Sequence, residues 1–382
     1  QGGVVAMNLN GVIYYFQVDY TAGTGGNDLV LTNFIPGDPA WKWTAGPKAR
    51  NAIGVFGTKG MGADTNNPGA RQGAMNWRAQ DGSLWMFGGY GYAQSVTNPP
   101  RYLNDLWQYD RENGRWIWQS GANVHNQYGN YDTQDPNSTP GGRHTGTTWT
   151  DSDGDLWLFG GYGIGTTPGL GRLNDLWRFD TGTARWTHMK GSNITGAAGV
   201  YGPANDPGNN PGARQGATGW ATPGFLWLFG GTTAGGATNL SDLWRYDIAS
   251  GKWTVIKGSA TTNVNGTYAG APAANTPGAR RDATGWVSKD NKLWLFGGLG
   301  RAATGSTLGD MSDLWSFDPA TGNWTHISGP TTQGSIGTYT ALGSAGTPAA
   351  RSAGSGWVTV DGDLWLVGGF KNNGDCYRGV WI

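Results

Sequence analysis

Short apolar runs, separated by Gly- and Asp-rich turns, recur along residues 40–382 of the chain. The clearest run is Leu-Trp-Leu-Phe-Gly-Gly or a close variant, at spacings of 72, 70, 67 and 71 residues. It begins at Leu84, Leu156, Leu226, Leu293 and Leu364. Apolar runs of four to eight residues bounded by turn residues are typical of β-strands. Their regular recurrence predicts five structural repeats.

Each repeat holds four such runs, which we name strands a, b, c and d in chain order. Strand a follows an Arg and contains a Trp six residues later; strand b is the Leu-Trp run. Strand c is the run Asn/Ser-Asp-Leu-Trp, degraded to Gly-Val-Trp-Ile at Gly379, and strand d carries a Trp after a short turn. Four antiparallel strands in a serial repeat predict an all-β fold, the β-propeller, with one blade per repeat.

The 22 tryptophans follow this register and suggest how the ring closes. Strands a, b and c each have five tryptophans, but strand d has four, because the last repeat stops after strand c. The stretch Ala-Trp-Lys-Trp-Thr at Ala40 aligns with strand d of the first repeat and places Trp41 in the missing class. We therefore predict five blades, about residues 71–118, 143–190, 214–257, 280–328, and 351–382 plus 40–46. An N-terminal strand then closes the propeller and removes its open edges.

Composition agrees with this assignment. The chain has 69 Gly and one Glu among its 382 residues, which disfavours helices. A buried Trp removes roughly 200 Å² of surface from water, so the repeated tryptophans are expected to pack between blades. The alternative is that some of them form platforms on which sugars stack.

The di-glycine after strand b, the Asp-Leu-Trp run and the closing Trp resemble kelch repeats, including the kelch propeller of galactose oxidase. The resemblance covers about residues 40–382, although kelch units are usually shorter and their propellers usually have six or seven blades. The long version of the repeat looks like the Trp-rich kelch repeats of bacterial surface proteins. The copper site of galactose oxidase needs a Tyr–Cys cross-link and two His, and nothing around Cys376 matches it.

Residues 1–35 lie before the repeats. Two strand-like runs, Gly11–Tyr20 and Asp28–Phe34, flank a Gly-rich stretch and predict a β-hairpin extension or the tail of a preceding domain. Residues 36–382 are the predicted propeller. The hairpin either packs on the propeller or is donated to a neighbouring molecule as an added strand.

Loop lengths predict which face of the propeller binds a partner. The a–b and c–d turns are short, whereas the b–c and d–a connections are long. In an up-and-down blade these two long connections lie on the same face, and binding usually resides on long loops carried by a rigid scaffold.

Five arginines precede strand a, one in each repeat: Arg71, Arg143, Arg214, Arg280 and Arg351. As a ring at the channel mouth they would bind an anion or carboxylate, because the guanidinium presents a planar fork of donors. The alternative is that each Arg holds its long loop or pairs with the strand-c Asp of its repeat: Asp105, Asp175, Asp242 or Asp313.

Charge and composition narrow the function. The 26 basic and 26 acidic residues balance, which removes the electrostatic reason to expect nucleic acid as a partner. No apolar run is long enough to span a membrane. The single Cys excludes a disulfide-rich scaffold. We expect an exported bacterial protein at the cell surface or outside the cell.

These observations lead to three hypotheses. The first is a non-catalytic binding or scaffold module that meets a glycan or protein partner at the long-loop face. The second is a structural subunit of a bacterial surface fibre or layer, which self-associates through residues 1–35. The third is a sugar-active kelch enzyme. We predict no catalytic residue, metal or cofactor, since four His and one Cys are scattered along the chain.

Overall fold

The computed structural model describes residues 4–9, 12–19, 30–35, 45–94, 100–233, 238–268, 270, 273–339, 345–371, 376–377 and 380–382. The chain forms two compact units, Gln1–Ala45 and Gly46–Ile382. No helix in the described part is long and apolar enough to cross a membrane.

The first unit contains a three-stranded antiparallel sheet in the order β1 (Val4–Leu9), β2 (Val12–Asp19) and β3 (Val30–Ile35). β2 and β3 occupy the two runs from which a hairpin is predicted. β1 is an additional strand that was not predicted, although the sequence carried a signal for it: the two residues between β1 and β2 are Asn10-Gly11, a pair typical of tight hairpin turns.

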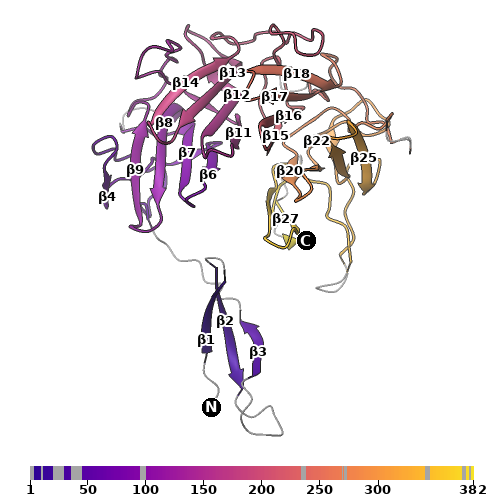
Figure 1. Cartoon of the computed structure of the whole chain (residues 1–382), viewed down its shortest axis with the longest axis horizontal. Helices are drawn as coiled ribbons and strands as arrows, with labels where there is room; N and C mark the ends of the chain where they lie inside the picture. Colours follow the sequence, from indigo (N-terminus) through magenta and orange to yellow (C-terminus); the bar gives the residue numbers. More distant parts are fainter. Residues whose placement is uncertain are drawn as a thin grey trace. The chain divides into compact units, whose positions relative to one another are not determined.

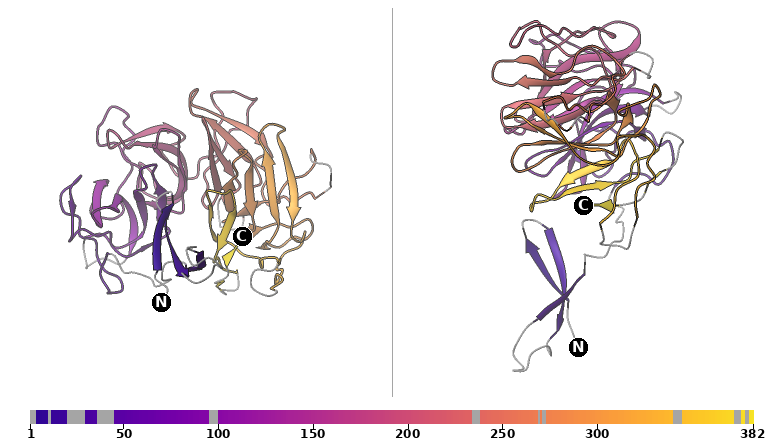
Figure 2. Two further views of the ribbon diagram at one scale, coloured as in Figure 1. Left: turned by 60° about the horizontal axis from the view of Figure 1, so that its bottom comes forward. Right: turned by 90° about the vertical axis from the view of Figure 1, so that its right-hand side faces the viewer.

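The second unit contains an antiparallel sheet for each of the five repeats, and the sheets follow one another in chain order (Figure 1 and Figure 2). The all-β prediction is confirmed. The first repeat comprises β4 (Gly62–Ala63), β5 (Arg71–Gln72), β6 (Met75–Arg78), β7 (Leu84–Gly91), β8 (Arg101–Asp110) and β9 (Arg115–Ser120). The second comprises β10 (Arg143–His144), β11 (Thr147–Thr150), β12 (Leu156–Ile164), β13 (Leu170–Asp180) and β14 (Arg185–Lys190).

The later repeats have shorter strands. The third comprises β15 (Thr218–Thr222), β16 (Phe225–Phe229), β17 (Leu243–Asp247) and β18 (Lys252–Lys257). The fourth comprises β19 (Arg280–Arg281), β20 (Thr284–Val287), β21 (Leu293–Phe296), β22 (Leu299–Gly300), β23 (Gly309–Asp310), β24 (Leu314–Asp318) and β25 (Asn323–Ser328). The fifth comprises β26 (Ser355–Val358), β27 (Leu364–Val367) and β28 (Val380–Trp381).

The di-glycine after strand b links each repeat to the next. In the second repeat Gly160 and Gly161 have φ values of 62° and 94°, a left-handed conformation that favours glycine. The strand pairing shifts register here, and the Gly161 N–H donates to the carbonyl oxygen of Arg214 in the third repeat at 2.9 Å. Equivalent bonds join Gly231 to Arg280 and Gly298 to Arg351. The di-glycine motif therefore hydrogen-bonds one repeat to the next.

The hydrophobic core lies between neighbouring sheets, as the tryptophan register predicts. One cluster joins Trp77, Trp85 and Phe87 of the first repeat to Trp177 and Trp186 of the second. Similar clusters join the second repeat to the third and the third to the fourth. Each strand-a indole also donates to the carbonyl oxygen of the strand-b Trp in the next repeat. These pairs are Trp77–Trp157, Trp149–Trp227, Trp220–Trp294 and Trp286–Trp365, at 2.9–3.0 Å.

The fifth repeat departs from this pattern. Trp357 of strand a is 46% exposed, whereas its four counterparts are 2–5% exposed. Its ring stacks instead on Trp365 of its own sheet, with centroids 6.0 Å apart. Trp41 and most of residues 40–46, the predicted closing strand, lie outside the described residues. Ring closure and the count of five blades therefore remain predictions.

Candidate functional site

The long b–c and d–a loops lie together, as expected for one face. The Gln94 N–H in the first b–c loop donates to the Asn123 carbonyl oxygen in the d–a loop at 3.1 Å. The same cross-loop bond recurs from Thr166 to Asn193 and from Ala303 to Thr331. We call the surface that these loops form the long-loop face.

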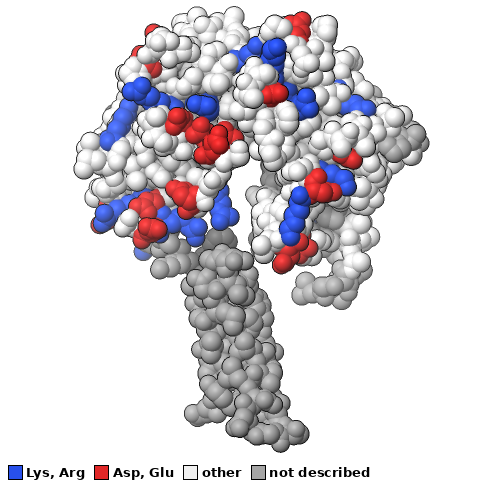
Figure 3. Space-filling model, viewed as in Figure 1, with Lys and Arg blue, Asp and Glu red and all other residues white. Residues whose placement is uncertain are grey.

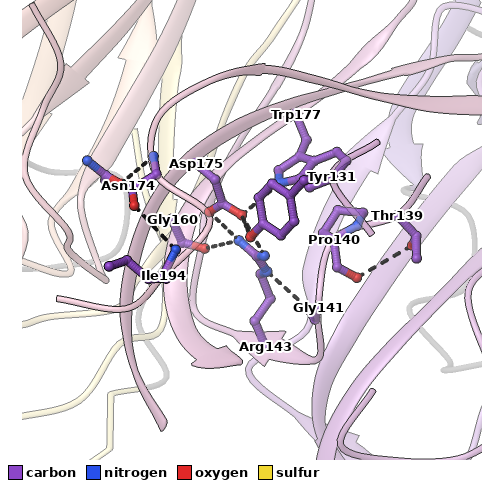
Figure 4. Close-up of polar contacts among 11 residues, drawn as sticks. Tyr131, Thr139, Pro140, Gly141, Arg143, Gly160, Asn174, Asp175, Trp177 and Ile194 are labelled. Atoms are coloured by element: carbon purple, nitrogen blue, oxygen red, sulfur yellow. Dashed lines mark hydrogen bonds and ion pairs between the residues drawn. The ribbon is translucent and has the colours of Figure 1, made fainter. Parts of the chain in front are cut away.

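Beneath this face, the predicted arginines are buried in a repeated set of contacts. In the second repeat the Arg143 guanidinium binds both oxygens of Asp175, at 2.6 and 2.7 Å (Figure 4). The hydroxyl of Tyr131 and the indole N–H of Trp177 both donate to Asp175 Oδ2, at 2.5 and 2.7 Å. Arg143 also donates to the carbonyl oxygens of Gly141 and Gly160. Every donor in this set therefore has an internal partner.

The same bidentate pair forms in three other repeats. The pairs are Arg71–Asp105, Arg214–Asp242 and Arg280–Asp313, with oxygens at 2.7–2.8 Å. In all four repeats the two side chains are at most 4% exposed. The predicted alternative, Arg–Asp pairing within the repeat, is what the structure shows. Anion binding by these arginines stays a prediction. In four of the five repeats the guanidinium donors are already occupied by the Asp of the same repeat.

The shifts in pKa follow from this pairing. Burial opposes ionisation of Asp175 and Asp313, but the adjacent guanidinium and the hydrogen bonds outweigh it and hold the pKa of each carboxyl below its usual value. Burial and the neighbouring carboxylate raise the pKa of Tyr131. The set of the second repeat thus keeps a charged pair and a neutral phenol at neutral pH.

The tyrosine of the set ties the long d–a loop to the sheet. Tyr201 and Tyr268 donate to Asp242 and Asp313 as Tyr131 donates to Asp175, at 2.6 and 2.7 Å. Phe56 holds this position in the first repeat, with its ring 4.9 Å from Trp107. The sequence contained a signal for this role, since a Gly-x-aromatic triplet recurs in every d–a connection. A rigid attachment of this kind presents the loops in fixed positions.

Arg351 of the fifth repeat has no carboxylate partner among the described residues. It is 1% exposed and donates to two carbonyl oxygens and to the hydroxyl of Tyr339. Burial lowers the pKa of Arg351, and no carboxylate in the described part of the chain offsets that effect. Four of the five predicted arginines are therefore paired with an Asp. The fifth, Arg351, has the same kinds of donor around it but no described carboxylate, and we call its surroundings the incomplete set.

Two grooves open on the long-loop face of the first three repeats. One, of about 420 Å³, is lined by Tyr90, Arg101, Tyr102 and Tyr128 among others. The other, of about 530 Å³, is lined by Tyr162, Arg172, Tyr201 and the 195–199 loop among others. Leu170, which is 51% exposed, lines both grooves. We call these the Tyr128 groove and the Arg172 groove.

A cluster of aromatic rings lies between the two grooves. Tyr102 stacks on His144 with centroids 5.7 Å apart and an interplanar angle of 12°, and its ring lies 5.9 Å from Tyr162. The Arg172 guanidinium lies 5.6 Å from the centre of the Tyr162 ring. Burial, followed by the nearby Arg172 charge, lowers the pKa of His144. A neutral, aromatic wall flanked by cations suits recognition of sugar rings or aromatic and acidic side chains.

These grooves were not predicted from the sequence. A detectable signal existed, because a Tyr follows the di-glycine only in the first two repeats, at Tyr90 and Tyr162. The described residues hold no group of three His, Cys, Asp or Glu side chains placed to bind a metal ion. On the face drawn in Figure 3, acidic and basic residues alternate over a largely uncharged surface.

Comparison with known proteins identifies the repeat. Residues 58–257 and 139–337 match the model of the KLHDC2/KLHL20/DRC7 Kelch-repeats domain family. Multiple epidermal growth factor-like domains protein 8 from Homo sapiens and from Mus musculus is 29% and 28% identical to this chain over 172 residues. That match spans 45% of this chain and 5% of each relative. The solved structure of YjhT aligns with a TM-score of 0.52 and 14% identity, over 96% of this chain and 87% of YjhT.

Proposed function

Because the chain belongs to the kelch-repeat family, whose rigid sheets carry long loops on one face, we propose that it is a non-catalytic binding or scaffold module. Its partner, a glycan or a protein, meets the long-loop face. We place this function at the bacterial cell surface or outside the cell. Self-association through residues 1–35 in a surface fibre, and sugar-active catalysis, are the alternatives to this proposal.

The observation that carries the proposal is the pair of grooves that share Leu170. Tyr128 and Leu170 are each 51% exposed although both are large and apolar. Exposed aromatic and aliphatic side chains that line a concave surface are typical of binding sites. Tyr offers a broad ring with few rotatable bonds, so it loses little entropy on binding.

Charge supports the same surface. Arg101 lines the Tyr128 groove and Arg172 lines the other, so each groove pairs tyrosines with a cation. The chain as a whole is neutral, so attraction arises from local contacts rather than from a long-range field. A partner with planar or ring-shaped groups and a few anionic or hydroxyl groups fits this combination.

Screening the whole chain on a glycan array and on an array of extracellular proteins tests the proposal. Tyr128→Ala and Leu170→Ala are expected to weaken binding of the partner found by about tenfold or more, because buried anchors carry most of the binding energy. Arg111→Ala, an exposed change in a short c–d turn, is the matched control and should bind normally. Binding that Arg111→Ala abolishes and the two groove variants leave intact would place the partner on the other face and overturn the proposal.

A further inference from the structure

Four repeats contain a closed set of contacts around one carboxylate. In each, a strand-c Asp accepts hydrogen bonds from the Arg before strand a and from the indole N–H of the strand-c Trp. The Trp-to-Asp bonds are 2.6–2.7 Å long. In three of the four a Tyr hydroxyl also donates to the same oxygen. The position is therefore built to hold a carboxylate.

Among the described residues, the fifth repeat has all three donors and no carboxylate acceptor for them. Arg351, Tyr339 and Trp381 occupy the positions of Arg280, Tyr268 and Trp315. The register is the same, since Trp381 pairs with Leu366 as Trp315 pairs with Leu295. The residue two before Trp381 is Gly379, where the other repeats have Asp. Gly and Asp differ by one CH₂–COO⁻ group, which has the size of an acetate ion.

The donors of the fifth set are left poorly satisfied. The Trp381 indole nitrogen is buried and has no hydrogen-bond partner among the residues that the structure describes. Within the described part of the chain, Arg351 Nη2 donates to the Tyr339 hydroxyl alone, at 3.2 Å, whereas its counterparts bind a carboxylate at 2.7–2.8 Å. The Arg351 guanidinium also lies 4.3 Å from the centre of the Tyr377 ring. A buried cation without a counter-ion and a buried N–H without an acceptor cost free energy, which an incoming anion would recover.

We propose that the fifth repeat binds a carboxylate group supplied by another molecule, held by Arg351, Tyr339 and Trp381. The carboxylate takes the place of the missing Asp side chain and accepts from the guanidinium, the phenol and the indole. Tyr339 is 58% exposed whereas Arg351 is 1% exposed, so the Tyr339 ring forms the solvent side of the set. This site shares no residue with the two grooves. Its test is therefore independent of the test of the proposed function.

Thermal unfolding of the whole chain in sodium acetate and in sodium chloride, at equal ionic strength and pH 7, tests the proposal. We expect about 100 mM acetate to raise the melting temperature of the wild type by about 1–3 °C relative to chloride. Gly379→Asp fills the site internally. It should melt at a higher temperature in chloride and lose the response to acetate. An equal response in the wild type and Gly379→Asp would overturn the proposal.

Asp313→Gly supplies the matched control, because it converts the fourth repeat into a copy of the fifth. It should melt lower in chloride and gain a larger acetate response than the wild type. Where it fails to fold, saturation-transfer NMR of acetate gives a second readout on stable protein. The acetate methyl signal should appear with the wild type and vanish with Gly379→Asp; its persistence with Gly379→Asp would refute the site.

Three probes separate the sources of the carboxylate. Acetate represents a free small acid, glucuronate a sugar acid, and N-acetyl-aspartyl methylamide an acidic side chain on a polypeptide. Competition of each probe with acetate in the NMR experiment assigns the source. Formate, a second small free acid, is the reference competitor. If formate competes with acetate and the two larger probes do not, the site takes small free acids. If neither formate nor a larger probe competes, the site does not bind carboxylates.

Discussion

The indole N–H of Trp220 in strand a of the third repeat donates to the carbonyl oxygen of Trp294 in strand b of the fourth, at 2.9 Å. The bond requires the two sheets to approach closely, and Gly285 of the fourth repeat allows this. A Cβ atom at Gly285 would lie 2.7 Å from Trp220 Nε1 and 2.6 Å from Thr218 Cγ2. At such distances a larger residue requires the Thr218 and Trp220 side chains, or the sheet that carries them, to move.

Gly285→Ala is therefore expected to destabilise the chain. Overpacking of a closely packed contact costs about 1–3 kcal/mol, because side chains and backbone must shift. Urea unfolding followed by tryptophan fluorescence measures the change. Gly182→Ala is the matched control, since Gly182 is exposed and the nearest atom to an added Cβ is 3.4 Å away. Equal midpoints for the two variants would show that sheet approach does not depend on Gly285.

Asp242→Ala should cost more, because it leaves the buried Arg214 guanidinium without its partner. Removal of one member of a buried ion pair costs about 3–5 kcal/mol. The same urea assay measures it, with Asp64→Ala as the control at an exposed ion pair. If the single variant does not fold, Arg214→Met with Asp242→Leu should recover folding, since it removes both charges. A single variant as stable as the wild type would contradict the structural role of the pair.

Phe56→Tyr should stabilise the first repeat. Phe56 is 1% exposed and lies 4.9 Å from Trp107, whereas Tyr131 lies 4.8 Å from Trp177 and bonds Asp175. The added hydroxyl should reach Asp105 and contribute about 1 kcal/mol. Tyr201→Phe is the reciprocal variant and should lose a similar amount. The proposal of equivalent positions fails if both variants change stability in the same direction.

Stability should fall steeply in acid. Asp175 and Asp313 have folded-state pKa values below the ordinary value of 3.8. Their contribution is therefore complete above about pH 4 and is lost as the pH falls through the lowered folded-state values. Unfolding free energies measured between pH 7 and pH 2 should show this loss. Asp175→Asn should reduce the slope below pH 4, and an unchanged slope would assign the acid sensitivity to other carboxyls.

The sequence alone determined the repeat, the strands and the purpose of the tryptophans. Leu84, Leu156 and their counterparts recur because each blade has the same small core, and local patterns of apolar residues and turns report such cores directly. The pairing of Asp105, Asp175, Asp242 and Asp313 with arginines was visible as an alternative, since both residue types hold constant positions.

Only the tertiary structure decided between the alternatives for the arginines and revealed the grooves. Arg143 lies in β10 and Asp175 in β13, with β12 between them in the sheet, and no local pattern encodes which side chains of these strands meet. Tyr128 and Leu170, 42 positions apart, line one groove because separate repeats pack side by side. The incomplete set around Arg351 was recognised from sequence and structure together. The sequence shows Gly379 in place of an Asp, and the packing shows which donors lack an acceptor among the described residues.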